Sequence, residues 1–371
     1  MTRSSEGQQA VPMVAEIVDA VVGVDTHRDT HEVEIASPGG AVIATCQISN
    51  DNTGFAELLA WIFDHAPGPR LAVSIEGTRS YGGGLARAAA AAGLMVVECA
   101  QPNRKARRGK GTSDPIDAHL AVLAALRLDA EALPTPRADG DREALRILLG
   151  ARQELTTAGT AQTNRLRALL LGGDDTDRTL ARGALTDTTL AALTRRRPPR
   201  EASREQAVRH AEIRRLTLAV REGARALTTN RAQLHVIVND LAPGLTKRRG
   251  VGPVSAAQAI VSFSHPGRCR NDAAFAALGG VNPLEANSGR TVRHRLNRGG
   301  DHALNRAIHT ITVTRMRCCP DTAAYVKKRT AQGKSLTEIR RCLKRYITRQ
   351  LYRTLNAAMT PAAVSTATET A

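Results

Sequence analysis

The chain has 371 residues, of which 42% are hydrophobic and 2% aromatic, so it can form two domains with aliphatic cores and is not a disordered protein. Its net charge of +17 is concentrated in residues 243–353, which contain 22 Lys and Arg but only 5 Asp and Glu. A basic domain of this kind is typical of proteins that bind nucleic acids. A GC-rich genome would account for 45 Arg against 7 Lys, but not for the scarcity of acids in this segment.

The cysteines and the N-terminus exclude other classes of protein. The six cysteines show neither a CxxC motif nor a Cys/His spacing that suits a metal site, which indicates reduced thiols. The chain begins without the basic and apolar segments of a secretory signal, and no apolar run approaches the roughly 18 residues of a transmembrane helix. We therefore expect a cytoplasmic protein that is neither secreted nor membrane-spanning.

The first part of the chain alternates predicted strands and helices. Residues 1–18 are predicted to be a disordered polar tail. After it, apolar alternation and turn residues predict five strands and three helices between residues 19 and 135. The strands are expected at Ala20–Asp25, His31–Ala36, Ala41–Ile48, Leu71–Glu76 and Leu94–Glu98, and the helices at Thr53–Asp64, Leu85–Ala92 and Asp114–Leu128. This order is that of a ribonuclease H-like (RuvC-like) domain, an α/β fold whose mixed sheet has helices on both faces.

The rest of the chain is predicted to be mainly helical. Leucines recur on helix faces over Asp141–Leu171 and Glu205–Leu241, and the weakly patterned residues 172–200 between them end in a break or loop. Two long helices around a loop suggest an antiparallel pair, so residues 141–241 are interpreted as a coiled-coil-like stalk for oligomerisation. The basic domain follows at residues 243–355, and a tail at residues 359–371, rich in Ala and Thr, is predicted to be disordered.

Four acids are placed to act together. Asp25 ends the first predicted strand and Glu76 the fourth, while Asp114 and Asp117 open a helix and share one of its faces. Because acids at the ends of neighbouring strands converge on one edge of a sheet, these carboxylates are expected to repel one another unless cations bind between them. Hard oxygen ligands beside a phosphate suit a pair of Mg²⁺ ions, which would clamp the attacking and leaving oxygens of a phosphodiester.

Each acid also has a simpler interpretation when it is taken alone. Asp114 stands before a proline, which also suits a helix N-cap, and Glu76 stands before a glycine, which also suits an exposed strand end. Nearby, His27 and His31 are interpreted as solvated side chains, and Asp29 as a group that supports the acids.

A second pattern is a glycine turn in the basic domain, with the sequence Arg248-Arg249-Gly250-Val251-Gly252-Pro253. It resembles a helix-hairpin-helix, in which a Gly-x-Gly turn lets backbone N–H groups approach a phosphate and the next helix N-terminus adds the positive end of its dipole. An ordinary turn between two helices is the alternative. The three basic residues at 247–249 favour contact with nucleic acid.

A third pattern surrounds Ser288. The serine lies in an Asn-Ser-Gly sequence, where it is expected to be exposed, and four nearby arginines are candidates to bind the flanking phosphates: Arg290, Arg293, Arg295 and Arg298. Serine is a weak nucleophile until a base or a metal activates it. On composition alone, this tripeptide is a common loop sequence.

Together these motifs resemble those of a known family, the DEDD-type transposases of bacterial insertion sequences (the IS110 group), which are regarded as RNA-guided recombinases. The resemblance covers residues 20–353, and the motifs occur in the family's order. They are Gly23-Val24-Asp25-Thr26-His27-Arg28-Asp29-Thr30-His31, Ile75-Glu76-Gly77-Thr78 and Lys110-Gly111-Thr112-Ser113-Asp114-Pro115-Ile116-Asp117-Ala118, then the turn at Gly250–Pro253 and the block around Ser288. Many members of the family have Lys where Arg28 stands here.

The resemblance implies a RuvC-like nuclease domain with Asp25, Glu76, Asp114 and Asp117 as its DEDD set and Mg²⁺ as its cofactor. It implies a transposase domain in which Ser288 attacks double-stranded DNA, at the element ends and the target, to form a phosphoserine link. It also implies a structured non-coding guide RNA and a homo-oligomer, a dimer or tetramer, in which the acids of one protomer complete a site with the serine of another. Such a protein would be associated with the bacterial nucleoid.

Two other functions remain open from the residues alone. A metal-dependent nuclease or junction resolvase would use the acids without a covalent intermediate. A degenerate copy of an element would bind DNA through its basic domain without catalysis, although the presence of all four acids and the serine argues against decay.

Overall fold

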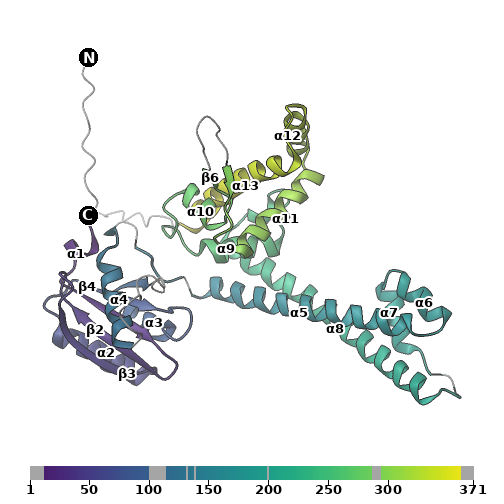
Figure 1. Cartoon of the computed structure of the whole chain (residues 1–371), viewed down its shortest axis with the longest axis horizontal. Helices are drawn as coiled ribbons and strands as arrows, with labels where there is room; N and C mark the ends of the chain where they lie inside the picture. Colours follow the sequence, from purple (N-terminus) through teal and green to yellow (C-terminus); the bar gives the residue numbers. More distant parts are fainter. Residues whose placement is uncertain are drawn as a thin grey trace, which may run out of the picture. The chain divides into compact units, whose positions relative to one another are not determined.

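The structure is a computed structural model that describes residues 12–99, 114–130, 133–137, 139–198, 200–285 and 294–360 (Figure 1). The chain divides into two compact units, Met1–Ala138 and Asp139–Ala371. The first is an α/β domain and the second is mainly helical, so the predicted fold class is confirmed. Among the helices that the structure describes, none combines the length and the apolar composition needed to span a bilayer.

The first unit is built on a five-stranded mixed sheet. Its strands are β1 (Ala20–Thr26), β2 (Thr30–Ala36), β3 (Val42–Ser49), β4 (Leu71–Glu76) and β5 (Met95–Cys99), in the order β3-β2-β1-β4-β5. β1, β2 and β3 are antiparallel, whereas β4 and β5 run parallel to β1. This is the ribonuclease H-like arrangement predicted from the element order, and every strand begins and ends within one residue of its predicted position.

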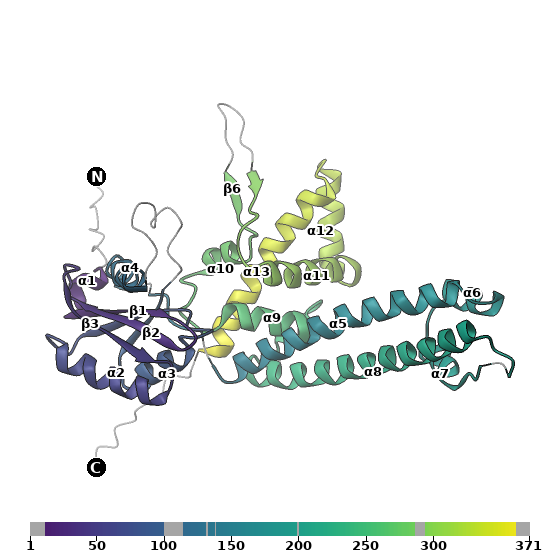
Figure 2. The ribbon, with the colours of Figure 1, turned by 60° about the horizontal axis from the view of Figure 1, so that its bottom comes forward.

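Helices cover both faces of this sheet (Figure 2). α2 (Asn52–His65) and α3 (Gly83–Ala91) pack on one face, and α4 (Asp114–Leu126) packs on the other. Each face has its own apolar core: Val22 of β1 belongs to the core under α2 and α3, while its neighbour Val21 belongs to the core under α4. Successive side chains of a strand point to opposite faces, so the same strands fill both cores.

The end of the predicted N-terminal tail is ordered. α1 (Val14–Ile17) precedes β1, and Val14 is fully buried in the core under α4. The Val14 backbone N–H donates a hydrogen bond to the Leu128 carbonyl oxygen at 2.9 Å. One turn of helix is too short to show an apolar period in the sequence, and its burial depends on α4, about 100 residues later in the chain.

The second unit begins with two long antiparallel helices, α5 (Asp141–Leu171) and α8 (Arg204–Leu241). They contact along their length, and the Asn230 side-chain amide on α8 donates a hydrogen bond to the Leu148 carbonyl oxygen on α5 at 2.8 Å. Their predicted extents, Asp141–Leu171 and Glu205–Leu241, agree with the structure to within one residue.

Two short helices occupy the segment between α5 and α8, where the sequence analysis expected a weakly patterned loop. They are α6 (Asp175–Arg182) and α7 (Asp187–Arg195), and each begins at a capping side chain, Asp174 and Thr186 respectively. Their apolar residues are few because four helices share one small core, which contains Leu166, Leu170, Ala181, Leu190, Leu193, Ile213 and Leu216.

The basic domain is a cluster of helices around an aliphatic and aromatic core. A 3₁₀ turn, η2 (Leu245–Lys247), leads to α9 (Pro253–Phe263), α10 (Asp272–Leu278), α11 (His302–Cys318), α12 (Pro320–Ala331) and α13 (Leu336–Met359). In the core the rings of Phe263, Phe275 and Tyr352 lie with their centroids 5.9 to 6.0 Å apart. The base of α5 and the end of α8 pack on the same core through Leu145 and Leu234.

Candidate active site

Two neighbouring parallel strands bring Asp25 and Glu76 to the same edge of the sheet. β1 and β4 pair with Val24 opposite Ile75, so the next residues along the two strands, Asp25 and Glu76, are neighbours. The Thr26 hydroxyl donates a hydrogen bond to the Glu76 carbonyl oxygen at 3.0 Å, which ties the two strand ends together. The structure therefore places two of the four predicted acids side by side.

Both acids face the side of the sheet that α4 covers. Val24 and Ile75 belong to the core under α2 and α3, and because side chains alternate along a strand, Asp25 and Glu76 face the opposite way. Asp25 is only 7% exposed. A carboxylate that is so far removed from water needs a cation or hydrogen-bond donors beside it, so this is a place where positive charge is favoured.

α4, which carries the other two acids, packs so closely against β1 that no side chain fits between them at Gly23. A Cβ on Gly23 would lie 2.2 Å from the Ala118 carbonyl oxygen and 2.6 Å from Val122 Cγ2. Gly23 lies on the same face as Asp25, two residues earlier, and Ala118 directly follows Asp117. Because Gly23 has no side chain, the turn of α4 that carries Asp117 can pack directly against β1, the strand that carries Asp25.

Asp114 is the first residue of α4, three residues before Asp117. Its side chain lies outside the described residues, so the structure gives its place on the helix but none of its contacts. Asp114 is thus the first helical position of α4, whereas an N-cap is the residue before that position.

The prediction that the two histidines near Asp25 are solvated is confirmed for His27 and wrong for His31. His27 is exposed, but its Nε2 lies 3.2 Å from Asp25 Oδ2, so it contacts the site. His31 is fully buried: its ring stacks on Phe55, and its Nδ1 donates a hydrogen bond to the Thr30 carbonyl oxygen at 3.0 Å. Burial lowers the pKa of His31 more than this hydrogen bond raises it. β2 begins at Thr30 and turns the next side chain, that of His31, inward.

Asp29, which the sequence analysis expected to support the acids, is exposed instead. Its carboxylate is bound by the neighbouring Arg28, with Nε 3.0 Å from Oδ1 and Nη2 2.8 Å from Oδ2. The supporting contact to Asp25 comes from His27, two residues earlier in the chain.

Cys99, at the end of β5, responds to both acids. Burial raises the pKa of its thiol, a hydrogen bond with Ser74 lowers it, and the nearby carboxylates of Glu76 and Asp25 raise it further. The Cys99 thiol therefore lies near both acids, at the ends of three adjacent strands. Cys99 was predicted to be a structural thiol; its place at the end of β5, the strand beside β4, could have indicated that it lies near the acids.

The predicted glycine turn in the second unit opens α9. Gly250 has a positive φ of 78°, and a Cβ there would lie 2.8 Å from Arg315 Cγ, so only glycine fits against α11. Gly252 is the N-cap of α9, makes no side-chain cap, and has no atom within 4 Å of the place where a Cβ would stand. Arg248 and Arg249, just before the turn, are exposed. Gly250 therefore allows close packing against α11, whereas Gly252 leaves the N-terminus of α9 open.

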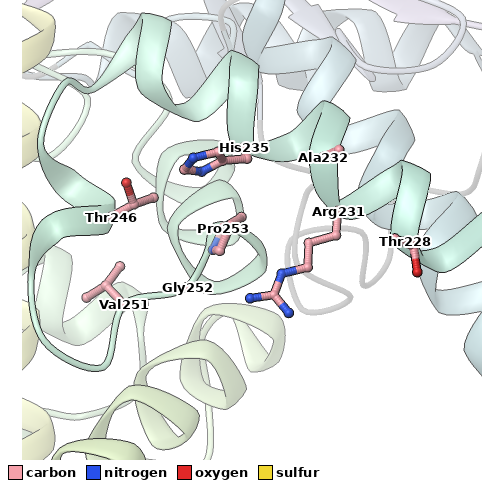
Figure 3. Close-up of a pocket in the computed structure, with 8 residues that line it drawn as sticks. All are labelled: Thr228, Arg231, Ala232, His235, Thr246, Val251, Gly252 and Pro253. Carbon is pink, nitrogen blue, oxygen red and sulfur yellow. The ribbon is translucent and has the colours of Figure 1, made fainter.

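A groove of about 530 Å³ lies between α8 and this turn (Figure 3). Arg231 and His235 reach into it from one face of α8, toward Gly252 and Pro253. Among the described residues that line the groove, none is acidic; the remaining ones are Thr228, Ala232, Thr246 and Val251. Arg231 and His235 could not be identified from the sequence, because they precede the turn by more than a dozen residues and meet it only in the folded unit.

Ser288 belongs to the segment between two short antiparallel strands, β6 (Pro283–Glu285) and β7 (His294–Leu296). Residues 286–293 lie outside the described residues, and with them three of the predicted positions: Ser288, Arg290 and Arg293. The other two predicted arginines, Arg295 and Arg298, are described and exposed.

The base of this hairpin is held by side-chain amides. Asn305 on α11 donates a hydrogen bond to the Gly279 carbonyl oxygen at 2.7 Å, and Asn297 donates one to the Asn282 side chain, also at 2.7 Å. Gly300 has a positive φ of 89°, which the close approach of the two chain segments requires. The described ends of the hairpin are therefore fixed to the helical core.

Comparison with known protein families matches both parts of the chain. A family model described as Transposase, with DEDD in its name, matches residues 22–173. A second, described as Transposase IS116/IS110/IS902 family, matches residues 243–327. The chain belongs to the IS110 family of transposases. A comparison with curated proteins gave no match.

As an IS110-family transposase, the protein is an enzyme that acts on DNA. The first match contains Asp25, Glu76, Asp114 and Asp117, and the second begins at the basic domain and contains Ser288. The resemblance inferred from the motifs is thus confirmed, together with the transposase class of the enzyme.

The DEDD domain of this transposase implies a divalent metal ion, and the chemistry of the donor set fits one. Asp25 and Glu76 present carboxylate oxygens on one face of the sheet, and Asp117 lies on the helix above it. Hard oxygen donors of this kind suit Mg²⁺. Within the described part of the chain, no three acidic, His or Cys side chains are already gathered closely enough to hold an ion, and the Asp114 side chain is not among them.

Proposed function

We propose that this transposase cuts and rejoins DNA strands at the ends of its element and at the target, with Mg²⁺ held by Asp25, Glu76, Asp114 and Asp117 and with Ser288 as the nucleophile. The observation that carries the proposal is the convergence of Asp25 and Glu76, from adjacent parallel strands, on the face that α4 covers. Asp25 is buried there, and burial disfavours its charge unless a cation or hydrogen-bond donors lie beside it.

The cutting and rejoining of a DNA strand takes two steps. The Ser288 Oγ attacks a backbone phosphorus, so that an Oγ–P bond forms and a P–O bond of the DNA breaks; the cut strand leaves as a hydroxyl, and the serine proton passes to a base or to solvent. A strand hydroxyl then attacks the phosphoserine, which restores the serine and a new phosphodiester. A divalent ion, when bound, stabilises charge on the attacking and leaving oxygens. Asp25 is oriented for its role by His27, 3.2 Å away.

The basic surfaces of the second unit support contact with nucleic-acid backbones. Arg248 and Arg249 are exposed beside the open start of α9, and Arg231 lines the groove on the other side of the turn. Guanidinium groups and helix N-termini are the usual partners of backbone phosphates. Further along the basic domain, Arg295 and Arg298 belong to the same set of proposed contacts. In line with the family, we include a guide RNA as well as DNA among the ligands.

Self-association is the third part of the proposal. Large apolar side chains are exposed on the two long helices, with Ile147 of α5 58% exposed and Val208 and Val236 of α8 63% and 59% exposed. Apolar groups left in water on long helices favour helix-to-helix assembly. We propose a dimer or tetramer in which the acids and the serine of one site come from different protomers.

The decisive experiment traps the covalent intermediate. Purified protein is incubated with Mg²⁺ and DNA that carries the element ends, then denatured, and protein-linked DNA is separated by electrophoresis. We expect a linked band for the wild type and none for Ser288→Ala, which still binds DNA. Undiminished recombination by Ser288→Ala would overturn the serine mechanism, and cleavage without any linked band would favour hydrolysis by the acids alone. Loss of all cleavage in Asp25→Asn is expected in either case.

The nucleic-acid groove has its own test. Each phosphate contact contributes about one unit to the slope of log K against log salt concentration. Arg231→Ala is therefore expected to lower this slope by about one, whereas Arg225→Ala, an exposed arginine on the same helix outside the groove, leaves it unchanged. Equal slopes for the wild type and the Arg231 variant would remove the groove from the proposed interface.

A further inference from the structure

A hydrogen-bonded pair, the buried Glu34 and the partly exposed His119, links the sheet to the acid-bearing helix. His119 Nδ1 on α4 lies 2.6 Å from Glu34 Oε1 on β2. Because a carboxylate can only accept, the imidazole Nδ1–H donates this hydrogen bond. Glu34 is 5% exposed, and a carboxylate buried to that extent is stable only with a donor beside it. Neither residue belongs to any motif that the sequence analysis identified.

The pair adjoins the closest contact between α4 and the sheet. Glu34 is the cross-strand partner of Gly23, the residue whose missing Cβ admits the Ala118 carbonyl oxygen. On β1, therefore, the helix backbone touches the strand, and on β2, directly alongside, a side chain of the same helix is hydrogen-bonded. Two contacts at neighbouring points on adjacent strands fix both the height of the helix and its rotation about its own axis.

Helix geometry relates this rotation to Asp117. Successive residues of an α-helix are separated by roughly 100°. Since Ala118 is 1% exposed and faces the sheet, Asp117 and His119 lie on opposite flanks of α4. The His119 flank faces β2, and the sheet order β2-β1-β4 then puts the Asp117 flank on the side of β4, where Glu76 lies.

We propose that Glu34 and His119 form a positioning pair that sets the rotation of α4 and so aims Asp117 at the edge where Asp25 and Glu76 lie. A carboxylate about 5–6 Å from the helix axis moves by about 1 Å when the helix turns by about 10°. Metal–oxygen distances tolerate only about 0.2 Å, so a small rotation decides whether the acids bind a cation together. This inference rests on the proposed function, because it takes these acids to hold the ion.

The test measures divalent-cation affinity directly, with Mn²⁺ as the probe and its free concentration followed by electron paramagnetic resonance on the full chain without DNA. His119→Leu removes the hydrogen-bond donor, and we expect the affinity for Mn²⁺ to fall by about tenfold or more. His119→Asn keeps an N–H near the place of Nδ1, and we expect affinity within about threefold of the wild type. Wild-type affinity in His119→Leu, or equal weakening in both variants, would overturn the positioning role.

Asp25→Asn separates this inference from the proposed metal site. Unchanged Mn²⁺ affinity in Asp25→Asn would refute the site itself, whereas weak binding there with wild-type affinity in His119→Leu would refute only the pair. Folding is followed by urea unfolding through the fluorescence of Trp61, the single tryptophan of the chain, which lies in the first unit. If His119→Leu unfolds, the double variant Glu34→Leu/His119→Leu is used instead, because it also removes the Glu34 carboxylate that has lost its donor. The double variant is expected to fold and to bind Mn²⁺ weakly. Tight binding of Mn²⁺ by the double variant would overturn the proposal.

Discussion

Gly23→Ala tests how closely the acid-bearing helix must approach the sheet. The added Cβ would lie 2.2 Å from the Ala118 carbonyl oxygen, where ordinary contact begins at 3.4 Å, and 2.9 Å from the Val122 backbone nitrogen. Both are backbone atoms and cannot rotate away, so α4 must move outward by about 1 Å. Overpacking of this kind destabilises a core by about 1–3 kcal/mol. A displacement of about 1 Å in a catalytic group lowers the rate by about 100-fold.

The assay combines two measurements on the same variant. Urea unfolding followed by Trp61 fluorescence gives the stability of the first unit, and strand cleavage of element-end DNA gives the rate. Gly39→Ala is the matched control in the same unit: its Cβ would meet only the Ser37 hydroxyl, at 3.8 Å, and its φ is not positive. It is expected to change stability by no more than about 0.5 kcal/mol and to leave cleavage unchanged.

A Gly23→Ala variant that unfolds at the same urea concentration as the wild type and cleaves DNA at the same rate would refute the argument that close approach of α4 positions Asp117. A loss of stability with a normal cleavage rate would show that the contact serves packing alone.

Three further predictions concern other parts of the molecule. Burial raises the pKa of Cys46 to about 11, so its alkylation by iodoacetamide should be slow at pH 8, and the rate should rise about tenfold per pH unit. A hydrogen bond with Thr322 lowers the pKa of Cys319, so Cys319 should react at lower pH than an ordinary thiol. Peptide mass spectrometry measures both rates. Arg142, 2% exposed, donates hydrogen bonds to the Val261 carbonyl oxygen at 3.2 and 3.3 Å, so Arg142→Met should destabilise the second unit by about 1–3 kcal/mol, measured by urea unfolding with circular dichroism. Gly300→Ala should destabilise the same unit by about 2 kcal/mol or more in that assay, because its φ is 89° and a Cβ would lie 2.4 Å from a backbone oxygen.

The sheet and the long helices could be predicted because their signals are local. Apolar alternation and turn residues locate each strand of the first unit, and leucine periodicity locates α5 and α8. Asp25 and Glu76 could be paired in advance since each ends a strand, and the order of elements fixes which strands are neighbours. What is visible at short range along the chain was therefore enough for the fold and for half of the acid set.

The contacts that complete the site depend on tertiary structure and leave no local pattern. His119 and Glu34 are 85 residues apart and appear in the sequence as an ordinary helix residue and an ordinary strand residue. His27 is exposed as predicted, but its contact with Asp25 depends on the turn after β1, which the residue types alone do not show. Arg231 is one of many arginines on α8 until the fold brings it to Gly252. For His119 and Arg231 the partner comes from another element of the fold.

The two long helices, α5 and α8, have fully buried side chains near both ends of the pair but not in its middle, and this affects where their backbone hydrogen bonds open. Along α5, which is described over its whole length, no side chain between Leu145 and Leu166 is fully buried, and along α8 none is between Thr217 and Asn230. Helices usually fray from their ends, where backbone groups lack partners. Here the amide hydrogens that exchange fastest with solvent are expected near Gly159, in the middle of the pair, while both ends stay protected.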